Sequence, residues 1–395
     1  MSLPAPRPAV QALLDDIVAL RRDLHRHAEL SYEETYTQRV IVERLRALGL
    51  EDVRAMAKTG VTALVRGAKP GPNLLWRADI DGLPLKEETG LPFASEGEAM
   101  HACGHDGHVA IALGLAAALM QSRARLAGTV RFAFQPAEER IGGAKNMIEE
   151  GVLDEPPVER AFGLHILSGV PVGEARVGPG PCFAAGTHFR IIVRGRGGHA
   201  SMPQETIDPI VVAAQVITAL QTVVSRNVAS HDEAVVTIGR LEGGKRGNII
   251  PDEVMMSGSI RTFDPDVLAR VLGRMEEIIA GVTSAFGAEH RFDYSTLPAV
   301  VNDAACAETV RRAAAGFLGE DRVRPERMMG SDDMAYFLEA RPGAYFFLGG
   351  GNAAKGITHP HHTSRFDFDE DCLGLGIELG LRVIEEATAS ALSPL

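Results

Sequence analysis

The 395-residue chain has few of the features that mark secreted or nucleic-acid-binding proteins. It contains only four cysteines, scattered along the sequence, which is no disulfide framework for so large a chain. A reducing compartment is therefore expected, with the cytoplasm as the default. Lys and Arg number 40 against 52 acidic residues, the net charge is -12, and no basic cluster is longer than a pair. Nucleic acid is not expected as a partner.

Long apolar runs are also missing. The longest, VAIALGLAAALM at residues 109–120, covers about half of the ~20 residues that a membrane-spanning helix needs. The N-terminal stretch MSLPAPRPAVQALLDD lacks the apolar core of an export signal and carries acidic residues instead. We expect neither a membrane anchor nor a signal peptide, and we interpret residues 109–120 as part of a buried helix.

Apolar residues at helical spacing predict two amphipathic helices at the start of the chain, over residues 7–27 and 36–50. Short apolar runs that end in polar or turn residues are typical of buried strands, and four of them follow, at residues 62–67, 73–79, 128–136 and 161–166. A helix over residues 106–122 lies between the second and third strands. This alternation predicts an α/β domain.

A second pattern begins after the Gly- and Pro-rich segment at residues 169–186, which we interpret as a crossing between domains. The pattern of residues 188–297 predicts the element order β-α-β-β-α-β, which is typical of the split ferredoxin-like unit. The alternation of helix and strand then resumes with a helix at 303–319, a strand at 344–351 and a closing helix at 371–389. We therefore expect an α/β domain of residues 1–182 and 298–395, interrupted by an inserted domain of residues 183–297.

Side chains that bind metals or move protons are concentrated in HACGHDGH, residues 101–108. Cys103 and His105 stand two positions apart in a loop before a helix, so both can converge on one point. Thiolate and imidazole are ligands that a borderline-soft divalent metal takes. The alternative is a loop with a buried thiol and solvated histidines.

Other donors occur at strand ends and in loops. QPAEE places Glu138 and Glu139 after a predicted strand, where one carboxylate can bind metal while the other moves a proton, and spacing alone does not say which. His165 lies in an apolar strand, where a lone histidine is more often a core residue. HPHHTSRFDFDE adds His359, His361 and His362. Each of these signals is weak by itself, but together with Cys103 and His105 they supply enough donors for two metal ions.

Nine segments, in order along nearly the whole chain, carry a resemblance to a known family: RRDLHRHAEL, WRADIDGLP, MHACGHDGH, FQPAEE, GLH, GRGGHAS, GGKRGNIIPD, GSDDMAYF and HHTSRFDFDE. The chain resembles the dinuclear metal amidohydrolases and carboxypeptidases that include hippurate hydrolase, N-acyl-amino-acid amidohydrolases and indole-acetyl-amino-acid hydrolases. The resemblance implies a zinc-peptidase-like catalytic domain with a central mixed sheet flanked by helices, and an inserted ferredoxin-like lid that also forms the dimer.

The resemblance implies roles for individual residues. The metal ligands would be Cys103, His105, Glu139, His165 and His362, with Cys103 shared between two ions. Glu138 would be the general base. Asp79 would orient a ligand, although an exposed aspartate at a strand end is the alternative.

In the inserted domain, the resemblance implies that His199 and Asn248 reach the active site, the histidine from the partner subunit of a homodimer. Arg261 is a candidate clamp for the substrate carboxylate.

The sequence departs from the family pattern at Ala28 and Ser364, where proline is usual, and at Asp332, where glutamate is usual. None of these is an expected ligand, so they bear on substrate fit.

The resulting hypothesis is a metal-dependent hydrolase that cleaves N-acyl amino acids into a carboxylic acid and a free amino acid. Zinc is favoured, and manganese, nickel or cobalt fit similar donor sets. Within the family the alternative is a dipeptidase or carboxypeptidase. A dimeric binding protein without turnover is a further alternative, which the presence of Glu138 and the full donor set disfavours. Zinc-dependent base deamination needs an H-x-E and a downstream P-C-x-x-C, and the sequence has neither.

Overall fold

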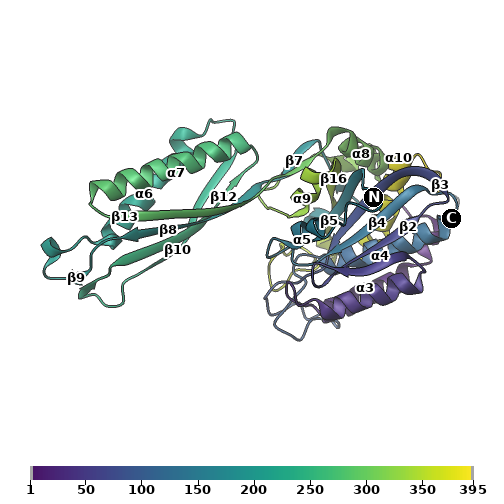
Figure 1. Ribbon diagram of the computed structural model, residues 1–395. Coiled ribbons are helices and arrows are strands. Elements are labelled where there is room, and N and C mark those ends of the chain that lie inside the picture. The colour runs from purple at the N-terminus through teal and green to yellow at the C-terminus, as the bar shows by residue number, and fades with distance from the viewer. Residues whose placement is uncertain (1–2, 393–395) are drawn as a thin grey trace. The chain divides into compact units, whose positions relative to one another are not determined.

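The computed structural model describes residues 3–392, which fold as two compact units (Figure 1). The second unit consists of Phe183–Ala299 together with the short segment Arg327–Ser331. The first unit comprises the rest of the described chain, so it is built from segments on both sides of the second.

The first unit is organised around an eight-stranded sheet in the order β1-β2-β4-β3-β5-β16-β6-β15. The four strands β4, β3, β5 and β16 run parallel at its centre, whereas β1 and β2 add antiparallel pairs at one edge. β4, β5 and β16 are almost wholly buried and β3 is buried from Leu74 to Asp79, as expected of a sheet covered on both faces. The strand bounds are β1 Glu51–Met56, β2 Gly60–Arg66, β3 Lys69–Asp79, β4 Ala127–Gln135, β5 Arg160–Pro171, β6 Ala175–Arg176, β15 Val323–Arg324 and β16 Gly343–Gly351.

Helices flank this sheet, which confirms the predicted α/β fold with a central mixed sheet. Helix α4 is apolar all round and almost fully buried, because it packs against α2, α10 and β3. The helix bounds are α1 Pro8–Gln11, α2 Leu14–Arg26, α3 Thr35–Ala47, α4 His105–Ser122, α5 Gly143–Glu149, α8 Ala304–Leu318, α9 Met334–Ala340 and α10 Asp371–Thr388. A separate two-stranded sheet pairs β7 Gly180–Phe183 with β14 Val300–Asn302, in the segments where the chain passes from one unit to the other.

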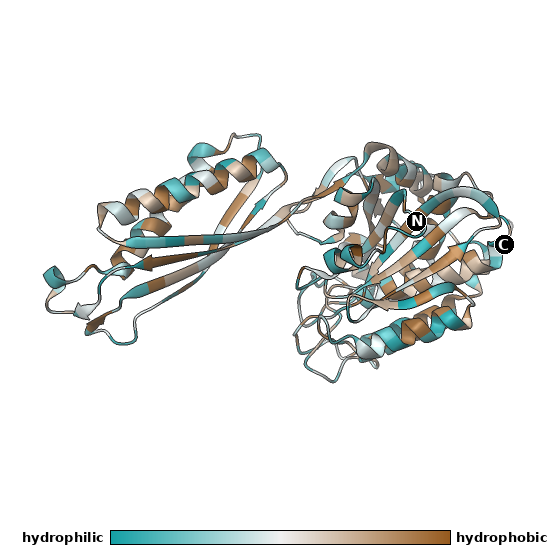
Figure 2. Ribbon diagram, in the orientation of Figure 1, coloured by the Kyte–Doolittle hydropathy of each residue, from teal (hydrophilic) through white to brown (hydrophobic). Residues whose placement is uncertain are grey.

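The second unit has the predicted β-α-β-β-α-β order. Its four-stranded antiparallel sheet has the order β10-β12-β8-β13. Buried residues of α6 and α7 join those of the sheet in one apolar core, and Figure 2 shows polar and apolar positions mixed along both helices, as amphipathic packing requires. The bounds are β8 Ala185–Arg194, β9 Gly198–His199, α6 Pro209–Asn227, β10 Ala234–Gly243, β11 Ile249–Ile250, β12 Glu253–Thr262, α7 Pro265–Ala285 and β13 Glu289–Leu297.

One helix, α6, is long and apolar enough by length and composition to cross a membrane. In the structure it is amphipathic instead: Val212, Val216 and Leu220 are buried in the core of the second unit, whereas Ile210 and Val211 are exposed. Its buried face is accounted for by packing on the sheet.

Two sequence predictions need correction. The helix predicted over residues 7–27 is interrupted by a turn, so that α1 and α2 are separate helices. No helix was predicted between the helix at 303–319 and the strand at 344–351, but α9 begins at Met334 within GSDDMAYF. The backbone carbonyl of Asp332 accepts the N–H of Ala335, and that of Asp333 the N–H of Tyr336, which forms the first turn of this helix.

Candidate metal centre

Cys103 and His105 are brought together by the turn at the start of α4. Gly104 between them has φ +87°, a left-handed conformation that glycine adopts without strain. His105 is the first residue of α4, and both donor side chains are buried. The Cys103 Sγ atom lies 3.4 Å from Nε2 of His165, which β5 contributes. The donor atoms of these three residues all lie within 4.8 Å of one another.

The orientation of His165 leaves one nitrogen for a metal. Its Nδ1 lies 2.7 Å from the backbone carbonyl oxygen of Ile166, which only accepts hydrogen bonds. Nδ1 therefore carries the proton, and the lone pair of Nε2 faces Cys103. Burial and the neighbouring histidines lower the pKa of His165 well below its usual value, which favours the neutral ring that a metal binds.

A second group of donors shares Cys103. The donor atoms of Cys103, Glu139 and His362 also lie within 4.8 Å of one another, and Nε2 of His362 is 3.3 Å from a Glu139 carboxylate oxygen. The backbone N–H of His362 donates to the carbonyl of Ala102 (2.9 Å), which holds this loop beside the thiol. Thus the five predicted ligands form two groups of metal-binding size with a common sulfur.

These residues fit a pair of divalent cations. Among the described residues, the ring nitrogens of His105 and one oxygen of Glu139 are buried without a well-aligned hydrogen bond, and their near neighbours are ionisable groups: Asp81 lies 3.3 Å from Nδ1 of His105, and Nε2 of His362 lies 3.3 Å from the Glu139 oxygen. Although burial lowers the pKa of His105, Asp79 and Asp81 raise it to about 10. Such an anionic, donor-rich interior favours a bound cation. The set of thiol, imidazole and carboxylate donors suits zinc and related transition metals.

Glu138 lies at the edge of the same group, with its carboxylate within 4.8 Å of donor atoms of His105 and Glu139. Its side chain is buried at the end of β4. Burial, together with the carboxylates of Asp332 and Glu139, raises the pKa of Glu138 well above its usual value. A carboxylate with a raised pKa is a better proton acceptor than an ordinary one.

Two residues that the sequence did not single out hold the donors in place. Asp81 accepts the backbone N–H groups of Glu138 (3.1 Å) and Glu139 (3.2 Å), and its carboxylate is 3.3 Å from Nδ1 of His105. His108 uses both ring nitrogens, because Nδ1 contacts Asp79 (2.5 Å) and Nε2 accepts the N–H of Ile166 (2.9 Å). His108 is therefore a structural residue. In the sequence, only their positions within WRADIDGLP and HACGHDGH indicate that Asp81 and His108 belong to the site.

Asp79 is fully buried rather than exposed at a strand end. Besides His108, it contacts the guanidinium of Arg77 (2.5 Å) and lies 3.7 Å from Nε2 of His105. Arg77 is itself buried and also pairs with Asp332 (3.0 Å) and Asp333 (3.2 Å). One buried guanidinium thus balances three carboxylates beside the donors, and Asp332, the departure from the family pattern, is one of them.

The remaining histidines of the C-terminal cluster are not part of either donor group. Nε2 of His361 accepts the backbone N–H of Ser168 (3.1 Å), and the carbonyl of His359 accepts the Ser168 hydroxyl (2.9 Å). Of the three histidines that the sequence left open, only His362 joins the donors.

The residues predicted in the inserted domain all lie in the second unit. His199 on β9 and Asn248 next to β11 are exposed neighbours, because β9 pairs with β11 and the N–H of Ala200 donates to the carbonyl of Asn248 (3.3 Å). Arg261 on β12 donates to the hydroxyl of Ser331, and its partial burial lowers its pKa. His199 and Asn248 thus form one pair at the β9–β11 end, whereas Arg261 lies on the sheet.

Comparison with known proteins decides the family. The sequence model of peptidase family M20/M25/M40 matches residues 75–386. The chain belongs to this family. Members are hydrolases, and the predicted resemblance is confirmed: the protein is a metal-dependent hydrolase of the amidohydrolase, deacetylase and carboxypeptidase group.

Two relatives and one solved structure illustrate this similarity. The chain is 41% identical over 377 residues to N-acetylcysteine deacetylase of Bacillus subtilis (strain 168), with 93% of this chain and 97% of the relative covered. It is 39% identical over 373 residues to thermostable carboxypeptidase 1 of Saccharolobus solfataricus (93% and 94% covered). The Bacillus subtilis YXEP protein, a dinuclear metal binding peptidase, has a TM-score of 0.83 at 35% identity (96% and 100% covered).

Proposed function

We propose that the protein hydrolyses the amide bond of N-acyl amino acids, such as hippurate-like, N-acetyl or indole-acetyl amino acids, to a carboxylic acid and a free amino acid. One observation carries this proposal: two donor groups that share Cys103 lie beside the buried carboxylate of Glu138. Hydrolysis of an unactivated amide needs both an electrophilic centre and a proton carrier, and this arrangement offers both.

The chain's own residues have distinct roles in this reaction. Two divalent ions, when bound to the five donors, would polarise the acyl carbonyl and acidify the attacking water. Glu138 accepts the proton of that water, then delivers it to the departing nitrogen, because an amine leaves poorly as an anion. Asp81 keeps Glu138 and Glu139 in position through their backbone N–H groups. Zinc is the favoured metal, with manganese, nickel and cobalt as alternatives.

We further propose that the second unit acts as a lid that binds substrate. His199 would donate to the oxyanion that forms at the acyl carbon. Asn248, its neighbour, would bind the substrate's polar end, and Arg261 would pair with the carboxylate. Both His199 and Asn248 are exposed in the second unit, as groups that contact a substrate must be before it binds.

We propose a homodimer formed through the second unit, and a cytoplasmic location. The edge strand β10 and helix α6 expose apolar side chains, among them Val235, Leu241, Ile210 and Val211. An unpaired edge strand with apolar neighbours is suited to pairing with a second copy. Four buried free cysteines are consistent with a reducing compartment.

The test is a hydrolysis panel with purified, metal-loaded protein. N-benzoyl, N-acetyl and indole-acetyl amino acids are compared with dipeptides, and amino acid release is measured. We expect N-acyl amino acids to be cleaved with the highest kcat/KM. A preference for dipeptides would instead support the second candidate, a dipeptidase or carboxypeptidase, which the 39% identity to a carboxypeptidase favours. Absence of hydrolysis across the panel would refute both.

A further inference from the structure

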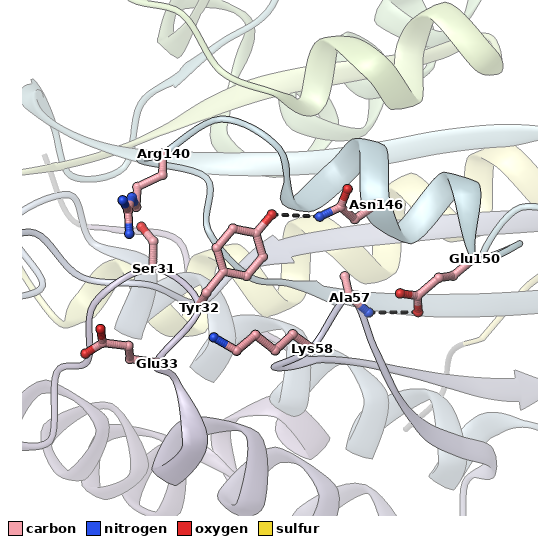
Figure 3. A pocket seen from close by; sticks show the side chains of 8 residues that line it. All are labelled: Ser31, Tyr32, Glu33, Ala57, Lys58, Arg140, Asn146 and Glu150. Carbon is pink, nitrogen blue, oxygen red and sulfur yellow. Dashed lines mark hydrogen bonds between the residues drawn. The ribbon is translucent and has the colours of Figure 1, made fainter.

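One cavity in the first unit is lined by none of the proposed metal donors (Figure 3). Its volume of about 440 Å³ lies within the range of small-molecule sites. It is formed by the loop after α2, the turn between β1 and β2, the loop after β4, and α5. The lining residues are Ser31, Tyr32, Glu33, Ala57, Lys58, Arg140, Asn146 and Glu150.

The cavity carries charges of both signs that the protein does not neutralise. The side chains of Lys58, Arg140 and Glu33 are exposed, and none forms an ion pair or a hydrogen bond with any residue between 3 and 392. The Lys58 ammonium lies over the face of the Tyr32 ring, 5.8 Å from its centre. Figure 3 shows Tyr32 between Arg140 and Lys58. Two cations and the Glu33 carboxylate therefore remain available to an occupant, whereas the second carboxylate of the lining, Glu150, already accepts the backbone N–H of Ala57 (2.8 Å).

The walls of this cavity are held in unusual backbone conformations. Eight described residues other than glycine have a positive φ, and five of them lie in the segments that form the cavity. These five are Tyr32 (65°), Ala57 (47°), Lys58 (73°), Ala137 (51°) and Ile141 (55°). Such conformations persist where the surrounding contacts fix them, and they concentrate at ligand sites. Here Asn146 donates to the Tyr32 hydroxyl (2.8 Å), and Glu150 accepts the N–H of Ala57 (2.8 Å).

The cavity is linked to the proposed catalytic carboxylates. Ser31 in its wall donates to Asp81 (2.6 Å), and Asp81 accepts the backbone N–H groups of Glu138 and Glu139. Arg140, which also lines the cavity, directly follows Glu139 in the chain. An occupant that contacts Arg140 therefore contacts the same loop that carries both carboxylates.

We propose that this cavity binds a free α-amino acid, with its carboxylate on Arg140 and Lys58 and its ammonium group on Glu33. A carboxylate matches the guanidinium and the ammonium of the two cations. The free carboxylate of Glu33 disfavours a simple anion such as phosphate, because like charges repel, and favours a ligand that also carries a positive charge. The proposal does not depend on the proposed reaction, since binding is measured without turnover.

Isothermal titration calorimetry of the metal-loaded protein tests this assignment, with L-leucine as the probe. Two analogues separate the ligand's charges: 4-methylpentanoate lacks the ammonium group and L-leucinamide lacks the carboxylate. We expect saturable binding of L-leucine, and binding of both analogues that is weaker by roughly tenfold or more. If 4-methylpentanoate binds as tightly as L-leucine, or L-leucine shows no saturable heat, the proposal is wrong.

Variants distinguish this cavity from the metal centre, where a released amino acid can also bind. Lys58→Gln and Arg140→Gln should each weaken L-leucine binding roughly tenfold while metal content and thermal stability stay unchanged. The control is Lys145→Gln on α5, an exposed lysine that does not line the cavity and should have no effect. Unchanged L-leucine affinity in both test variants would overturn the proposal. If no substrate in the hydrolysis panel is cleaved, the proposed reaction is refuted, but the proposed binding of an amino acid in this cavity is not affected.

Discussion

At the scale of single residues, Glu138 and Glu139 are neighbours in the chain but occupy different surroundings. Glu138 is buried beside Asp332 and Glu139, so its pKa is raised well above the usual value. Glu139 has an oxygen 3.3 Å from Nε2 of His362 and belongs to the donor group that includes Cys103. The geometry therefore separates a carboxylate suited to proton transfer from one suited to coordination.

This separation predicts different consequences of two substitutions. Glu138→Gln should retain about two metal ions per chain but lose roughly 10²–10⁴-fold in kcat, the usual contribution of a general acid-base group. Glu139→Ala should lose metal as well as activity, because a donor is removed. Elemental analysis and steady-state kinetics of both variants provide the measurement. Near-native kcat in Glu138→Gln would show that another group is the base.

The residue pattern alone indicated Cys103 and His105 as metal ligands, but only the resemblance chose between Glu138 and Glu139 and among the three C-terminal histidines, because spacing does not distinguish them. The structure gives a physical reason to prefer His362 to His361 as a metal ligand, because the ring of His361 already accepts a backbone N–H. Asp81 was missed because its role consists of contacts with residues far along the chain, and no local pattern records such contacts.

At the scale of elements, prediction succeeded where apolar periodicity is strong. The β-α-β-β-α-β order predicted for residues 188–297 is the order of β8, α6, β10, β12, α7 and β13 in the structure. The edge strand β1 and the short helices α5 and α9 were not predicted. β1 is mostly exposed, and both helices have only seven residues, too few for a helical pattern to stand out. Tertiary contacts define these elements, as where Asp333 accepts the N–H of Ala144 (3.1 Å).

Helix α5 packs closely on the loop of the proposed base, which yields a second prediction. A Cβ atom at Gly143 would lie 1.6 Å from the backbone carbonyl oxygen of Pro136, so either the helix or the loop must move. Gly143→Ala should destabilise the first unit by about 1–3 kcal/mol and reduce kcat. Urea unfolding followed by the fluorescence of Trp76, the chain's one tryptophan and a buried residue of β3, measures the change.

Gly316→Ala on α8 is the matched control for this substitution, because it lies in the same unit and a Cβ there meets nothing within 4 Å. Replacing an exposed helical glycine with alanine should stabilise by up to about 1 kcal/mol. The two variants are expected to change stability in opposite directions. Equal stability and activity of Gly143→Ala and the unsubstituted protein would contradict the close packing.

At the scale of the whole molecule, all five proposed ligands and Trp76 lie in the first unit, and none of these six residues lies in the second unit. Metal that binds only folded protein stabilises it, by about 4 kcal/mol when free metal exceeds Kd a thousandfold. Removal of metal by a chelator should therefore lower the unfolding free energy reported by Trp76 by a similar amount. Hydrogen exchange in α6 and β8 should change little. An unchanged Trp76 transition would argue against metal bound by these donors.

The last prediction concerns assembly. If His199 acts from the partner subunit, His199→Ala and Glu138→Gln should each be nearly inactive as homodimers, because every site lacks one group. After subunit exchange, half of the dimers are hybrids in which one site has a native Glu138 from one chain and a native His199 from the other. Mixing should therefore restore about a quarter of the native activity. The edge strand β10, which exposes Val235 and Leu241, is the surface proposed for such pairing, and size-exclusion chromatography with light scattering tests whether the protein is a dimer. Hybrids of confirmed exchange that stay inactive, or an active monomer, would require His199 to act within its own chain or not at all.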